Sequence, residues 1–198
     1  MLTSEFKALQ VYCGLGGAAL GFQNAVQEFK GVRGHFRNIA GLDSDPAACA
    51  DYEMLTRAPV HVMDLFTRKQ YIDFHGHEPP ANWHEVHPEE VIFVCNNEYP
   101  DGVFLSAPCK GFSSLLPKKT SQTAKYQALN GLALRGLDLV TRAFIKNLPG
   151  LLIFENVPRV AVRGKALLDC WRRLKGAKKG GKVFVRSGMR TWVSPGGF

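Results

Sequence analysis

The sequence predicts an α/β fold in which a mostly parallel sheet is covered by helices on both faces. Three observations carry this prediction. Short apolar segments alternate with segments of helical periodicity, a glycine turn follows the first apolar segment, and acidic or reactive side chains follow the later ones. Strands that alternate with helices form parallel sheets, and their carboxyl ends share one edge where ligands bind.

The first predicted unit is a strand, a glycine turn and a helix. The strand covers residues 8–12, and the turn Cys13-Gly14-Leu15-Gly16-Gly17 follows it. Glycines allow a sharp bend and a close approach to a ligand, and amides at a helix start attract an anion. A purely structural turn explains the same residues. The helix is predicted from the spacing of Leu20, Phe22, Ala25, Val26 and Phe29.

An acidic residue follows each of the next two predicted strands. Residues 38–42 lead to Asp43, and residues 59–63 lead to Asp64. An acid after the second strand is placed to bind a ribose diol, and we favour this over a helix-capping role for Asp43. Asp64 could accept a hydrogen bond from an adenine amino group or cap a turn. Ser44, or the Asp that follows it, is suited to start the next helix.

The chemically most informative stretch is a fourth strand, 103–106, that ends in Pro108-Cys109. A helix is predicted over 129–148, and a fifth strand over 151–154 ends in Glu155-Asn156. Thiol and carboxylate would then follow strands of the same sheet. A thiolate can add to an electron-poor ring carbon while a carboxylic acid protonates a ring nitrogen. Taken alone, Cys109 is better explained as a packed structural cysteine than as a nucleophile. A final helix is predicted within 166–174.

Three segments carry weaker signals. Residues 67–90 are polar, and we expect an irregular insertion there, while 91–95 fit either a strand or a helix. The basic stretch 113–127 is expected to be a lid, a nucleic-acid contact or a surface loop. Four histidines between His75 and His87 fit a solvated loop better than a metal site, since no paired cysteines accompany them.

Composition limits the class of protein. The net charge of +8 is concentrated in 159–198, which hold eleven Lys or Arg residues and one acidic residue. Such a segment suits either nucleic-acid binding or a solvated tail. Five scattered cysteines without a C-x-x-C pair argue against a disulfide framework and a zinc site. No signal peptide or membrane-spanning run is present, so a cytoplasmic protein is expected.

Taken together, the motifs resemble those of the cytosine-5 DNA methyltransferases. The resemblance covers roughly residues 8–175, in the family's order. Its most specific part is the pairing of Pro-Cys with Glu-Asn-Val. The motifs that carry it are Tyr12 to Gly17, Asp43 to Cys49, Asp64, Pro108 to Ser113 and Phe154 to Val157.

This resemblance implies a Rossmann-like S-adenosylmethionine-dependent methyltransferase fold and a role in DNA methylation. The target cytosine would be flipped out of double-stranded DNA, attacked at C6 by Cys109 and protonated at N3 by Glu155, with Asn156 orienting the loops. Lys110 and Ser113 would contact DNA. The residues implied to bind S-adenosylmethionine are Tyr12, Cys13, Gly14, Leu15, Gly16, Gly17, Asp43, Ser44, Asp64, Leu65 and Pro108.

The sequence also departs from the family. Lys110 stands where the family usually has Gln, and the family's Gln-x-Arg-x-Arg motif, target-recognition region and closing helix are not recognisable. We therefore expect a catalytic domain over 1–175 with an insertion near 67–100, a basic irregular tail over 176–198, and a C-terminally truncated member or one half of a split enzyme with a second polypeptide. The alternatives are a non-catalytic S-adenosylmethionine-binding remnant and a basic nucleic-acid-binding module.

Overall fold

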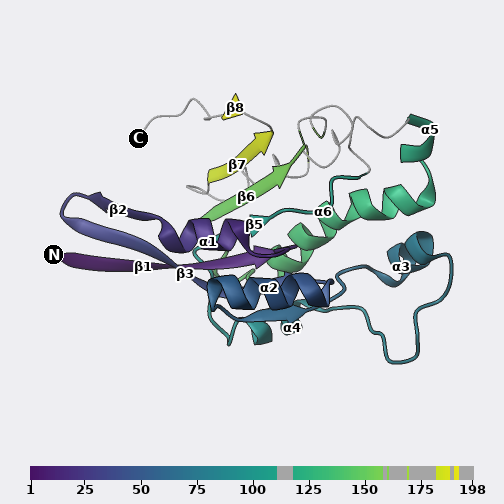
Figure 1. The fold of residues 1–198 in the computed structure, drawn as a ribbon, viewed down its shortest axis with the longest axis horizontal. Coiled ribbons are helices and arrows are strands. Elements are labelled where there is room, and N and C mark those ends of the chain that lie inside the picture. The colour runs from purple at the N-terminus through teal and green to yellow at the C-terminus, as the bar shows by residue number, and fades with distance from the viewer. Residues whose placement is uncertain (111–117, 158–159, 161–168, 170–181, 188–189, 192–198) are drawn as a thin grey trace.

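The structure is a computed structural model, and it describes residues 1–110, 118–157, 160, 169, 182–187 and 190–191. Strands and helices alternate along most of this length (Figure 1). The elements are β1 (Leu2–Val11), α1 (Gly17–Asn24), β2 (Val26–Phe29), β3 (Val32–Asp43), α2 (Pro46–Thr56), β4 (Val60–Val62), α3 (Arg68–His75), α4 (Pro88–Val94), β5 (Gly102–Leu105), α5 (Lys118–Ser121), α6 (Ala124–Ala143), β6 (Leu151–Asn156), β7 (Lys182–Ser187) and β8 (Arg190–Thr191).

All these strands belong to one sheet, ordered β2-β3-β1-β5-β6-β7-β8, with β4 also paired to β3. The pairs β4–β3, β3–β1, β1–β5, β5–β6 and β6–β7 are parallel, while β2 and β8 add antiparallel pairs at the two ends. The predicted α/β fold with a mostly parallel sheet is thus confirmed. Because the central strands run the same way, the ends of β1, β3, β4, β5 and β6 meet at one carboxyl edge.

Helices cover both faces of the sheet. On one face, the buried side chain of Gln10 donates to Asn38, which donates to a carbonyl of α1, and the α1 ring of Phe22 lies edge-on to Phe104 of β5. On the other face, Leu105 packs toward α6, which also contacts α3 and α4. The main hydrophobic core lies between β1, β5, β6 and this second layer of helices.

The first predicted helix is shorter than its sequence spacing suggests. α1 ends at Asn24, and Val26–Phe29 form the antiparallel strand β2, so the prediction of helix as far as Phe29 is wrong. The reason lies in the next two residues. Lys30 and Gly31 both adopt positive φ, 49° and 76°, which is the geometry of a tight hairpin turn. The hairpin with β3 therefore overrides a helical spacing.

Other differences concern the weaker signals. Residues 67–90, expected to be irregular, contain α3, whose start is fixed by a capping box between Thr67 and Gln70. Residues 91–95, left open above, belong mostly to α4. α6 begins and ends about five residues before the predicted 129–148. β7 and β8 lie within 176–198, expected to be irregular, and the predicted helix over 166–174 falls almost entirely outside the described residues.

Candidate functional site

The glycine turn after β1 is packed on one side and open on the other. Gly14 and Gly16 have φ of 51° and 92°, values that side chains rarely tolerate. A Cβ on Gly16 would lie 2.9 Å from the Tyr52 ring of α2, so the turn rests closely on that helix. A Cβ on Gly14 or Gly17 would meet nothing within 4 Å. The turn therefore leaves space for a ligand above its backbone, and Leu15 within it is exposed.

Asp43 joins this turn to the start of α2. Its Oδ2 accepts from the Gly14 amide at 2.8 Å, and its Oδ1 accepts from the Asp45 amide at 3.0 Å. Asp45 in turn caps α2 by accepting from Ala47 N at 2.9 Å, while Ser44 between them is exposed. Each carboxylate oxygen has two lone pairs. Asp43 therefore organises two loops and retains acceptor capacity for a ribose hydroxyl.

Tyr12 attaches the glycine turn to α6. Its backbone also has positive φ, 59°, yet its side chain is directed to α6, where the hydroxyl donates to Leu132 O at 2.7 Å. A Cβ on Gly136 would lie 2.9 Å from the Tyr12 ring, so only glycine fits there. Burial raises the pKa of the Tyr12 hydroxyl, which stays protonated. The Tyr12 carbonyl accepts from the Ser106 hydroxyl at 2.7 Å, which links the turn to the end of β5.

The third acidic residue, Asp64, follows β4 at the same edge. Its Oδ1 accepts from Phe66 N and its Oδ2 from the indole nitrogen of Trp83, both at 3.0 Å. Leu65 beside it is buried, and its carbonyl accepts from the side chain of Arg135 at 3.3 Å. Asp64 is therefore held in one orientation by two donors.

The ends of β5 and β6 bring the predicted catalytic segments next to each other. β5 and β6 pair with Leu105 opposite Phe154, so Glu155 continues β6 beside the segment that leads to Cys109. The buried side chain of Asn156 donates to Ala107 O at 3.0 Å and accepts from the next amide. Pro108 and Cys109 are half-buried and Glu155 is exposed. One side-chain amide thus bridges the two segments.

The other described thiols are poor nucleophiles. Burial raises the pKa of Cys13 and of Cys95 to about 12, with Asp43 adding to the effect at Cys13. Burial also raises the pKa of Cys49. These three side chains therefore stay protonated near neutral pH. Of the predicted DNA contacts, Lys110 is exposed, and Ser113 lies outside the described residues.

The part of the chain that the structure describes holds neither a cluster of metal ligands nor a membrane-spanning helix. No group of three or more His, Cys, Asp or Glu side chains is arranged to hold a metal ion. His84 instead contacts Glu90 at 2.8 Å, and His75 stacks on Tyr71 with ring centres 4.2 Å apart. No described helix is both long and apolar enough to cross a membrane.

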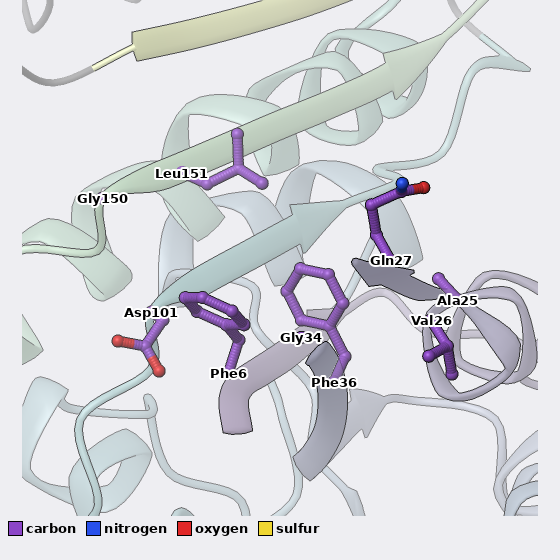
Figure 2. A pocket seen from close by; sticks show the side chains of 9 residues that line it. All are labelled: Phe6, Ala25, Val26, Gln27, Gly34, Phe36, Asp101, Gly150 and Leu151. Atoms are coloured by element: carbon purple, nitrogen blue, oxygen red, sulfur yellow. The ribbon is translucent and has the colours of Figure 1, made fainter. Parts of the chain in front are cut away.

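A separate apolar cavity lies near the amino end of the sheet. It has a volume of about 510 Å³, and Figure 2 shows the Phe6 and Phe36 rings facing it. The other lining residues are Ala25, Val26, Gln27, Gly34, Asp101, Gly150 and Leu151. Asp101 and Gly150 directly precede β5 and β6, whereas Cys109 and Glu155 come at or after the ends of these strands. The cavity is therefore distinct from the carboxyl edge.

Comparison with known proteins identifies the fold. The described architecture is similar to that of a solved methyltransferase, the Dnmt2 methyltransferase of S. pombe, with a TM-score of 0.52 at 18% sequence identity. The match covers 87% of this chain and 41% of that one. No protein-family model matches the sequence, and no curated protein matches it.

The fold is accordingly the Rossmann-like α/β fold of methyltransferases. Three further residues contribute to this edge of the sheet without being predictable from the sequence, namely Trp83, Ser106 and Arg135. The Trp83 indole donates to Asp64, and the Arg135 side chain donates to the carbonyl of the neighbouring Leu65. The Ser106 hydroxyl donates to the Tyr12 carbonyl. Their sequence spacing carries no signal, because each contacts a segment far away in the chain. The one available hint is a tryptophan within a segment of mostly polar residues, 67–90.

Proposed function

We propose that this chain is the catalytic part of a DNA (cytosine-5)-methyltransferase that uses S-adenosylmethionine. The observation that carries the proposal is the bridge from Asn156 to the Ala107 carbonyl, which holds the segment bearing Cys109 beside the strand bearing Glu155. This pairing of thiol and carboxyl suits addition to a pyrimidine ring. The methyltransferase fold, the open glycine turn and the ordered motifs add support.

The residues present at the carboxyl edge fit the cofactor. Open space above Gly14 and Gly17 admits a ligand, and the free acceptor capacity of Asp43 suits a ribose diol. The turn 12–17, Asp43, Ser44, Asp64, Leu65 and Pro108 would hold the bound molecule, which supplies an electrophilic methyl group. Tyr12 and Cys13 would contribute backbone rather than a reactive side chain, because one is hydrogen-bonded to α6 and the other is partly buried.

In the proposed reaction, the Cys109 thiolate forms a bond to C6 of a flipped cytosine, and Glu155 gives a proton to N3. The electron pair then develops at C5, which accepts the methyl group. Loss of the C5 proton to a base expels Cys109 as thiolate, and N3 returns its proton to Glu155. The net products are 5-methylcytosine, S-adenosylhomocysteine and one proton. Lys110 and Ser113 would contact the DNA backbone.

The test is covalent trapping. A duplex with 5-fluorocytosine is incubated with S-adenosylmethionine and the protein, alone and with a supplied target-recognition polypeptide. A 5-fluorine cannot leave as a cation, so the adduct accumulates. We expect an adduct that is lost in Cys109→Ser, while the dissociation constant for the cofactor changes less than about threefold.

Two results would contradict the proposal. One is saturable cofactor binding without any adduct, even with the second polypeptide, which identifies a non-catalytic remnant. The other is DNA binding without saturable cofactor binding, which identifies a basic nucleic-acid-binding module instead.

A further inference from the structure

The Trp83 indole has a specific polar contact at the carboxyl edge. Its Nε1–H donates to Asp64 Oδ2 at 3.0 Å, on the oxygen opposite to the one bound by the Phe66 amide. Two donors on two different oxygens fix the plane of a carboxylate. One lone pair remains on each oxygen, and a carboxylate can only accept hydrogen bonds.

Trp83 is itself held in place by the segment that carries it. Its ring lies 5.1 Å from the Tyr71 ring of α3, and its amide donates to Pro80 O at 2.9 Å. The Arg68 amide at the start of α3 donates to Glu85 at 3.0 Å, so α3 is joined to the chain just beyond Trp83. The indole is therefore positioned by its surroundings before any ligand binds.

Arg135 connects this segment to the core. Its side chain is 9% exposed and donates to Val86 O at 2.6 Å and to Leu65 O at 3.3 Å. It also pairs with Glu85 at 3.2 Å. The two loops that meet in the contact between Trp83 and Asp64 are thus both attached to α6, which lies in the main core. A preorganised acceptor of this kind discriminates well between ligands.

We propose that Trp83 is a positioning residue for the adenine subsite, and that it orients Asp64 to accept from the exocyclic amine of the base. This inference rests on the proposed S-adenosylmethionine site. It gives the segment 67–90 a function, namely selection of adenine over hypoxanthine. Adenine carries an amine at position 6, whereas hypoxanthine carries a carbonyl oxygen, which would face the fixed carboxylate oxygen without a proton between them.

The experiment measures two dissociation constants by calorimetry, one for S-adenosylhomocysteine and one for S-inosylhomocysteine. We expect the wild-type chain to bind the adenosyl ligand about 10–100-fold more tightly, as for a hydrogen bond to a charged group. In Trp83→Phe the ring stays and the donor is lost. The ratio of the inosyl to the adenosyl dissociation constant should fall to less than about a third of the wild-type value, mostly because the adenosyl ligand binds more weakly.

Further variants separate positioning from packing. Tyr71→Leu removes the ring that packs against Trp83 but leaves the indole N–H in place, so the ratio of the two dissociation constants should fall less than in Trp83→Phe. Trp83→His restores a ring N–H and should recover part of the ratio, and it also serves if Trp83→Phe fails to fold. In an Asp64→Ala background, Trp83→Phe should have no further effect on the ratio, because Trp83 acts through Asp64.

Three outcomes would overturn the inference. If Trp83→Phe weakens both ligands equally, Trp83 has only a structural role. If Trp83→His discriminates no better than Trp83→Phe, the indole N–H is not what matters. If the wild-type chain binds neither ligand, the cofactor site of the proposed function fails as well. The first two outcomes, by contrast, overturn only the role of Trp83 and leave the cofactor site intact.

Discussion

The carboxyl and amino ends of the sheet are built from the same strands in opposite ways. At the carboxyl end, polar atoms from distant segments fix the loops, as in the bonds from Gly14 to Asp43, from Trp83 to Asp64 and from Asn156 to Ala107. At the amino end, β1 and β3 project beyond the helices (Figure 1). One side of these strands borders the apolar cavity.

The opposite side of that amino end is charged. Arg37 of β3 forms a two-pronged pair with Glu98, at 2.7 and 3.1 Å, and a further bond of 2.9 Å to Glu5 of β1. Lys7 adds a contact of 2.9 Å to Glu98. One end of the sheet thus uses polar groups to set backbone geometry, and the other uses them as ion pairs at the surface. Substitutions should accordingly change binding and chemistry at the first end and acid stability at the second.

The largest effect is expected at the exposed Glu155. Glu155→Gln removes the proposed proton donor and should lower methyl transfer by about 10²–10⁴-fold. The unfolding free energy should change by less than about 0.5 kcal/mol because the side chain is exposed. Single-turnover transfer of labelled methyl and urea unfolding measure the two quantities. Glu53→Gln, an exposed site on α2, is the matched control, and equal rates in both variants would refute the role of Glu155.

The next largest effect concerns two neighbouring aspartates. Asp43→Ala leaves the Gly14 and Asp45 amides without their acceptor and should weaken cofactor binding by about 10–100-fold. Asp45→Ala removes only the cap of α2, which costs about 1 kcal/mol of stability. Calorimetric titration compares the two. Equal losses of affinity would show that Asp43 acts only through α2.

Acid should weaken the amino end. Hydrogen bonds from Arg37 and then Lys7 lower the pKa of Glu98 to about 2. A depressed folded-state pKa stabilises the fold above the unfolded value of 4.5, and this stabilisation is lost as the pH falls from there toward 2. Because the side chains of Glu98 and Lys7 are partly exposed, the stabilisation that is lost amounts to about 1 kcal/mol.

Urea unfolding at pH 7 and pH 3 measures the stabilisation that ionised Glu98 contributes. Wild type should lose about 1 kcal/mol more than Glu98→Gln between the two pH values, since the variant lacks the titrating group. A parallel decline of both proteins would mean that Glu98 is not the group responsible.

The smallest effect is expected at Phe29 in β2. This ring is 71% exposed, and its described contact is with the Lys30 ammonium, 5.3 Å from the ring centre. Phe29→Ser should therefore change the unfolding free energy by about 0.5 kcal/mol or less. Thermal unfolding of dilute protein is the measurement. A loss several times larger would show that the ring is covered in solution.

The sequence was informative where local patterns decide the structure. The central strands, the glycine turn, the acid that ends β3 and the acid after β4 lie close to where alternation and turn chemistry predict them, although β1 and β3 each begin six residues earlier than predicted. Competition between local signals explains the error at Val26–Phe29, where a two-residue turn outweighed a helical spacing. At the candidate site, residue types at strand ends were predictable. Their partners were not, because Trp83 and Leu132 reach the edge only through tertiary packing.

The bond from Tyr12 to Leu132 also has a consequence for synthesis. The two residues are 120 positions apart, so the glycine turn leaves the ribosome long before the helix that fixes it. At about 5–20 residues per second, the delay is roughly 6–24 s. During that time nothing from α6 holds Tyr12 at its positive φ. The turn is among the first parts of the chain to be made, but its contact with α6 forms only after residue 132 has been synthesised.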